Sequence, residues 1–154
     1  MKRIRKLLGM AVAFAFALAI LPATALAVDE YDLHVNGEQF TSEKLVIDCG
    51  EGTATYDPAT QNLTLNNATI TKATMSGGIY SMLSNDLTIT LQGNNQITLE
   101  NNLGAIIKSN LKIEGPGTLT INVTGDTQDG ITCQWGSVDI MNATLVINAS
   151  GGIG

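Results

Sequence analysis

The sequence predicts an all-β chain folded as a parallel β-solenoid of about four short rungs, and three repeated features support this. Short strands with alternating apolar residues recur, as in Leu87, Ile89 and Leu91. A polar turn and a second alternating strand follow each of them, as at Ile97 and Leu99. A third element then repeats a phrase of small or acidic residues with isoleucine. Three strands per rung suit a solenoid, because each rung buries its inward side chains only against its neighbours.

The third element sets the length of the repeat. Its four copies are Gly77-Gly78-Ile79, Gly104-Ala105-Ile106, Asp129-Gly130-Ile131 and Gly151-Gly152-Ile153. The isoleucines are 27, 25 and 22 residues apart, and we expect them to occupy equivalent positions in successive rungs. Residues 61–154 are therefore predicted to form the rungs, with Asn and Thr at the turns and outward positions.

Residues 28–60 differ from the repeat and predict an N-terminal cap of antiparallel hairpins. Tyr31–Val35 alternates, Asn36-Gly37 is a strong tight-turn signal, and Leu45–Ile47 forms a further strand. A cap is needed because an uncovered terminal rung offers free N–H and C=O groups. Gly151–Gly154 stops partway through a rung. We expect the chain to be a fragment of a longer protein, or its last rung to be covered by another molecule. End-to-end self-association is a further option.

Residues 1–27 have the form of a secretory signal peptide. Four basic residues within positions 2–6 precede an apolar run from Leu7 to Leu21, and Pro22 breaks that run. Ala25-Leu26-Ala27 then supplies a cleavage signal of small residues. The run is short for a membrane span, although a retained signal anchor is the alternative. The expected location is secreted or extracellular, in association with a cell surface, without membrane insertion of the mature chain.

Charge narrows the choice of partner. Without residues 1–27, four lysines and no arginine stand against 14 acidic residues, a formal charge of 4 − 14 = −10. Such a chain is a poor partner for nucleic acid or anionic membranes. It suits neutral or cationic ligands, or anionic ones bridged by a divalent cation. The two cysteines, Cys49 and Cys133, leave a disulfide open, because spacing does not show whether their Cα atoms come within bonding range.

Two segments resemble the N-terminal module of secreted bacterial surface proteins. They are Tyr31–Gly37 and Ala54–Ile70, and Asp129-Gly130-Ile131 is similar to the G-x-D-G-I signature of the rungs that follow that module. These proteins are described as carbohydrate-binding-domain-containing or right-handed β-helix proteins. The resemblance implies a right-handed parallel β-helix, and binding of calcium and acidic plant polysaccharides by some members. Gly77, Gly104 and Gly151 stand where the family often has an acid, which argues against a calcium site in every rung.

The candidate metal ligands are Asp126 and Asp129. The loop Gly125–Gly130 brings their carboxylates together with several carbonyls, and Ca²⁺ prefers oxygen ligands. The alternative is two solvated acids in a turn. Asp86 and Glu114 would add ligands only if they projected at the same corner.

The candidate sugar-binding residues are Trp135, Gln134 and Tyr80. An exposed indole stacks on the apolar C–H faces of sugar rings, and Trp135 is the only tryptophan, with Gln134 beside it. Tyr80 falls in the corresponding segment of the first rung and would extend the platform. The alternative is a packed corner aromatic.

Catalysis is not expected. His34 is the only histidine, so no triad or polyhistidine metal site can form within the chain. A glycoside hydrolase needs two enclosed carboxylates, and a pectate-lyase-like enzyme needs a cationic base beside calcium. We therefore expect a non-catalytic polysaccharide-binding module, assisted by calcium or free of any cofactor. The alternatives are a ligand-free stalk or spacer of a larger adhesin, then a lyase or hydrolase, and lastly an ice-binding threonine face.

Overall fold

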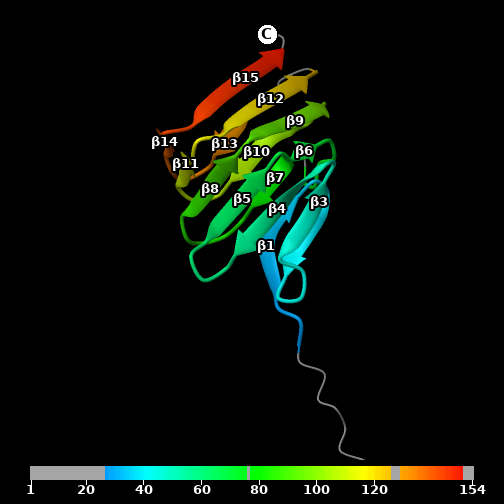
Figure 1. Cartoon of the computed structure of the whole chain (residues 1–154), viewed down its shortest axis with the longest axis vertical. Helices are drawn as coiled ribbons and strands as arrows, with labels where there is room; N and C mark the ends of the chain where they lie inside the picture. The colour runs from blue at the N-terminus through cyan, green and yellow to red at the C-terminus, as the bar shows by residue number, and fades with distance from the viewer. Residues whose placement is uncertain (1–26, 76, 126–128, 151–154) are drawn as a thin grey trace, which may run out of the picture.

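The described part of the chain is all-β. The structure is a computed structural model, and it describes residues 27–75, 77–125 and 129–150; these ranges hold 15 strands and no α-helix (Figure 1). No helix in them is long and apolar enough to cross a membrane. The predicted signal peptide, apart from Ala27, and the segment Gly151–Gly154 lie outside the described residues.

Three sheets stack into a parallel β-solenoid, as predicted (Figure 1). Sheet A has the order β13-β10-β7-β1-β2, sheet B has β14-β11-β8-β5-β4-β3, and sheet C has β15-β12-β9-β6. The first rung comprises β5 (Asn62–Asn66), β6 (Thr69–Ile70) and β7 (Gly77–Ser81), and the second β8 (Leu87–Gln92), β9 (Asn94–Glu100) and β10 (Leu103–Ile107). The third comprises β11 (Leu111–Glu114), β12 (Thr118–Thr124) and β13 (Ile131–Cys133), followed by β14 (Val138–Met141) and β15 (Thr144–Ser150).

The core consists of apolar columns that run from rung to rung. In sheet B, Ile89 pairs with Ile113, and Ile113 with Ile140. In sheet C, Ile97 and Ile121 pair in the same way. The members of these columns in the second and third rungs are fully buried, whereas Ile140 is 49% exposed. Burying one such side chain contributes about 1.5–3 kcal/mol, so each added rung stabilises the stack.

The cap consists of antiparallel hairpins at the N-terminal end. Its strands are β1 (Glu30–Val35), β2 (Glu38–Thr41), β3 (Val46–Cys49) and β4 (Gly52–Asp57). β1 pairs antiparallel with β2 and with β7, and β4 pairs antiparallel with β3 and β5. The turn residue Asn36 fixes the hairpin to the first rung, because its Oδ1 accepts from the N–H groups of Thr71 (3.0 Å) and Lys72 (3.1 Å).

The turns use left-handed asparagines, as the sequence predicts. Asn67 (φ 50°) and Asn142 (φ 54°) both stand at the corner between sheets B and C. They belong to the echoed phrases Asn66–Ile70 and Met141–Leu145. The echo therefore marks one recurring turn, because asparagine tolerates the left-handed region better than most residues.

The predicted equivalence of Ile106 with Ile79 and Ile131 is wrong by one residue. Ala105 pairs with both Ile79 and Ile131, whereas Ile106 pairs with Tyr80. A slip of one residue moves a side chain to the opposite face of the sheet. Ile106 is therefore outside the core column.

Ile106 is nevertheless buried on its own face of sheet A. Its exposed fraction is 6%. A Cβ added at Gly77 would lie 3.3 Å from Cγ1 of Ile106, so the absence of a side chain there leaves room for the isoleucine.

The two cysteines are free thiols. Cys49 is in the cap strand β3, and Cys133 is in β13 at the other end of the solenoid. Burial raises the pKa of Cys49 to about 11 and also raises the pKa of Cys133. Both side chains therefore act as small, uncharged groups.

Candidate functional site

Trp135 lies in the turn between β13 and β14, at the corner that joins sheets A and B. Its side chain is 75% exposed, so it is not a packed corner aromatic. Its backbone N–H donates to the carbonyl of Lys108 (3.2 Å), and the N–H of Gln134 donates to that of Ile107 (2.9 Å). The turn is thus held to the preceding rung while the indole and Gln134 remain exposed.

Tyr80 lies elsewhere. Its ring is half-buried on sheet A and meets His34 edge-on, with centroids 5.9 Å apart. Through Ile106, Tyr80 is in register with Thr132 rather than with the turn that holds Trp135. Tyr80 lies two strands away from Thr132 in sheet A, and Trp135 follows Thr132 by three residues. The structure therefore separates Tyr80 from Trp135 and pairs its ring with His34.

The candidate metal ligands are dispersed where they can be placed. Asp129 is exposed just before β13, and Oδ2 of its carboxylate accepts from the Thr132 hydroxyl (3.2 Å). Asp126 lies outside the described residues. Asp86 precedes β8 and Glu114 ends β11, so neither shares a corner with Asp129. In the described ranges, no three His, Cys, Asp or Glu side chains gather in a metal-binding group, and the calcium expectation rests on the loop sequence alone.

A polar groove of about 310 Å³ lies at the same A–B corner as Trp135. Its apolar lining consists of the first residues of β8 and β11, Leu87 and Leu111, and its polar lining consists of Asp86, Thr88, Asn110, Lys112, Ser137 and Asp139. The pairing of β8, β11 and β14 arranges these side chains in two columns across three rungs: Asp86–Asn110–Ser137 and Thr88–Lys112–Asp139.

The first column is joined by hydrogen bonds. Asn110 Nδ2 donates to Asp86 Oδ1 (3.0 Å), and Asn110 Oδ1 accepts from the backbone N–H of Ser137 (3.0 Å). The Ser137 hydroxyl also donates to Asn110 Oδ1 (3.4 Å). Because Asn110 is held from both sides, the carboxylate, amide and hydroxyl form an ordered row.

The second column carries both signs of charge. Lys112 stands between Thr88 and Asp139 in the register, and its Nζ lies 2.6 Å from Oε2 of Glu114 on the same strand. Glu114 therefore balances the lysine from outside the groove lining. Asp86 and Asp139 are the two carboxylates that line the groove.

The groove shares one turn with the indole, because Trp135 is two residues before Ser137, which lines the groove. An exposed apolar ring at the same corner as a row of carboxylate, amide and hydroxyl groups is suited to a ligand with apolar C–H faces and many hydroxyls. We did not predict this groove from the sequence. A signal was present, since Asp86, Asn110 and Ser137 each precede the apolar residue that opens a sheet-B strand.

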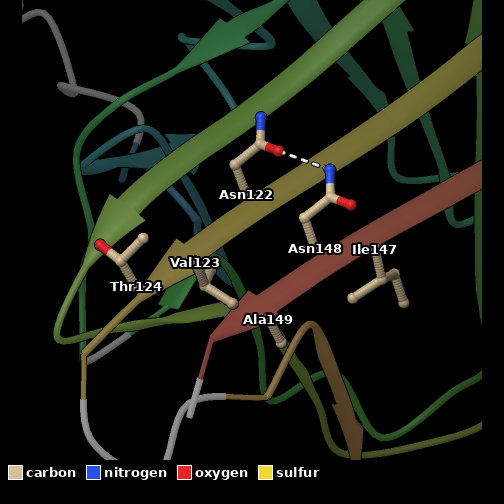
Figure 2. Close-up of a pocket in the computed structure, with 6 residues that line it drawn as sticks. All are labelled: Asn122, Val123, Thr124, Ile147, Asn148 and Ala149. Atoms are coloured by element: carbon tan, nitrogen blue, oxygen red, sulfur yellow. Dashed lines mark hydrogen bonds between the residues drawn. The ribbon is translucent and has the colours of Figure 1, made fainter.

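A second hollow, of about 530 Å³, lies at the end of sheet C (Figure 2). Asn122 and Asn148 lie on one side of β12 and β15, and Asn148 Nδ2 donates to Asn122 Oδ1 (2.8 Å). Val123, Ile147 and Ala149 lie on the opposite side (Figure 2). The hollow is thus bordered on one side by side chains that continue the core, and the polar residues of its lining, Asn122, Thr124 and Asn148, include no charged group.

Comparisons of the chain with protein-family models, curated proteins and solved structures found no match.

Proposed function

We propose that the protein is a non-catalytic carbohydrate-binding module, exported and located outside the cell or at a cell surface. The observation that carries the proposal is the exposed indole of Trp135 in the turn that also forms one end of the polar groove. The resemblance of Tyr31–Gly37 and Ala54–Ile70 to secreted bacterial carbohydrate-binding proteins supports it, as does the form of residues 1–27.

The mechanism is additive. Successive rungs repeat their polar side chains about every 4.8 Å, the spacing between paired strands. Trp135 would stack on one sugar ring, while Asn110, Ser137 and Asp86 exchange hydrogen bonds with ring hydroxyls. Each contact is weak, and affinity comes from summing contacts along a polymer chain.

The same geometry favours binding over catalysis. The chain's only histidine, His34, pairs with Tyr80 across sheet A rather than with the groove. Lys112, the lysine in the groove, is paired with Glu114. General acid–base chemistry requires a group positioned to take a proton from the substrate; His34 lies outside the groove and Lys112 is ion-paired, so the remaining groups of this kind in the groove are Asp86 and Asp139.

Calcium belongs to the proposal only through the loop that contains Asp126 and Asp129. If that loop binds the ion, it would allow an acidic polysaccharide to approach an acidic protein. Adding millimolar calcium, and then a chelator, to every binding measurement below tests this part separately.

Trp135 provides a direct test because it is the only tryptophan. We expect its fluorescence to change on titration with a bound glycan, across a panel of neutral, acidic and amino-sugar polymers. In affinity electrophoresis, Trp135→Ala should lose most of its retardation. Met75→Ala, which removes another exposed apolar side chain (68%), should not. The proposal fails if no glycan changes the fluorescence and none retards the protein more than albumin.

A structural spacer is the second candidate. It is favoured by the inward side chains of β14 and β15, which remain partly exposed although they continue the core columns. A spacer would stack on further protein at this end and would bind no glycan in the titration.

A further inference from the structure

The charges in the groove indicate which kind of sugar it binds. We propose that the ligand is a cationic amino-sugar polymer, a chain of hexosamine units whose amines are free and protonated. This inference rests on the proposed carbohydrate-binding function and adds the ligand class to it.

Both carboxylates in the groove are placed to meet ammonium groups. Asp86 opens the first column and Asp139 closes the second, so they stand at diagonal ends of the lining. Asn110 holds Asp86 through Oδ1 at 3.0 Å. A carboxylate held in position forms charge-assisted hydrogen bonds with N–H donors, which are stronger than neutral ones.

Lys112 does not reverse this preference. Its ammonium group lies 2.6 Å from the carboxylate of Glu114, so that pair is balanced on its own strand. The two aspartates then leave the groove with a negative potential. The net charge of the whole chain is also negative, with 14 acidic residues against eight basic ones. Such a field attracts cationic ligands and repels acidic polymers unless a divalent cation intervenes.

The indole fits the same ligand. Trp135 is 75% exposed at this corner, and the face of an indole attracts cations as well as apolar C–H groups. A protonated hexosamine presents both kinds of group on one ring. A neutral sugar would use the stacking surface but would offer no charge to Asp86 and Asp139.

The experiment measures retention of the full chain on four insoluble polymers: unacetylated polyglucosamine, its N-acetylated counterpart, cellulose and cross-linked polygalacturonate. We expect strongest retention on polyglucosamine, weakening as salt screens the charges. The double variant Asp86→Asn/Asp139→Asn should weaken it about fivefold to tenfold, as expected for two exposed ion pairs. Asparagine keeps an acceptor oxygen toward Asn110, so folding should be preserved.

The control is Asp48→Asn/Glu51→Gln, which removes two exposed carboxylates of the cap and causes the same change in net charge. It should leave retention unchanged. Equal loss in both double variants would show unspecific attraction to a polycation and overturn the inference. Stronger retention on the acetylated or neutral polymer would also overturn it while leaving the proposed function intact. Retention on none of the polymers would defeat the proposed function itself.

Discussion

Asn95 lies inside the solenoid, 2% exposed, and its side chain links three rungs. Its Oδ1 accepts from the N–H of Ala68 (2.9 Å), while Nδ2 donates to the carbonyls of Gln92 (3.2 Å) and Thr118 (3.3 Å). The amide thus gives the Ala68 N–H an acceptor at the turn between sheets B and C and ties it to two backbone carbonyls, of which that of Gln92 also accepts from the Asn67 N–H (3.1 Å). A buried polar group without a partner costs about 1–3 kcal/mol.

We therefore expect Asn95→Ala to lower the free energy of unfolding by about 2 kcal/mol or more. Urea unfolding followed by circular dichroism measures this. The control is Gln96→Ala on the next, exposed position, whose amide donates to the Thr98 hydroxyl at the surface; it should change stability by less than about 0.5 kcal/mol. Similar losses in the two variants would contradict this role for Asn95.

Single residues were predictable where local backbone chemistry decides their role. Left-handed asparagines at the corners follow from what asparagine tolerates, and Asn67 and Asn142 occupy such turns. Asn95 was not predictable, because its position pairs with Leu119 in a column that is otherwise apolar. Its partners come from three different rungs, and no local pattern indicates them.

At the scale of elements, the cap hairpin meets the first rung through strands β1 and β7. His34 stands opposite Tyr80 of β7 and Gln39 of β2, and its Nδ1 is buried without a hydrogen-bond partner. Burial lowers the pKa of His34 below its usual 6.5, although the nearby carboxylates of Asp32 and Glu30 act in the opposite direction. The folded hairpin therefore favours the neutral imidazole.

Because of this lowered pKa, the free energy of unfolding depends on pH. Well above pH 6.5 the imidazole of His34 is neutral in both the folded and the unfolded state, and proton uptake by His34 then costs the folded state no stability. As the pH falls below 6.5, the unfolded chain takes up the proton first, so stability is lost until the pH passes the lower pKa of the folded state. Thermal midpoints of the wild type between pH 7.5 and 5 should fall more steeply than those of His34→Gln. Parallel curves would show that His34 makes no contribution.

Strand positions were predictable, whereas the register of one strand was not. Regular alternation, as in β9 and β12, identifies both the strand and its inward face. In β10, Ala105, Ile106 and Ile107 are consecutive apolar residues, so alternation gives no phase.

The register of β10 depends instead on glycine. A Cβ at Gly104 would collide with the carbonyl of Gly130 and with Cγ2 of Ile121, and one at Gly78 would lie 3.0 Å from Ile97. These glycines face the side chains of sheet C at close approach. They therefore fix Ala105, rather than Ile106, opposite Ile79.

At the scale of the whole molecule, the last described strands have an uncovered apolar side. Val138 (39% exposed), Ile140 (49%) and Ile147 (44%) pair with buried residues of the third rung and continue the core columns. Strand β15 is seven residues long and carries no charge or proline. Such an edge invites pairing with another strand.

We expect the purified chain to self-associate through this end, with a sedimentation coefficient that rises with concentration. Val146→Lys places a charge on the outward face of β15 and should shift the population toward monomer. The control Val46→Lys makes the same change on the exposed cap strand β3, at the opposite end, and should not. A monomer at all concentrations, or an equal effect of both variants, would rule out association through β15.

The groove was not predicted from the sequence, because the shared position of its residues before sheet-B strands gains meaning only once the rungs are stacked. Asp86, Asn110 and Ser137 are 24 and 27 residues apart and become neighbours only through the pairing of β8, β11 and β14. Trp135 was predictable as a sugar-binding candidate from its residue type, while its exposure depends on the corner it occupies. The expected platform with Tyr80 required two residues to share a turn, and the register separates them.

The nearest-neighbour pairing of rungs also has a mechanical consequence. Each parallel strand pairs only with the strand before and after it in its sheet, whereas β1 is paired with β7 across the cap. Among the described strands, tension applied from the β15 side would therefore separate β15 and β14 from β12 and β11 before it reached the earlier rungs. The cap, whose strands are cross-paired, would give way last, so the molecule would extend in steps under load instead of rupturing at once.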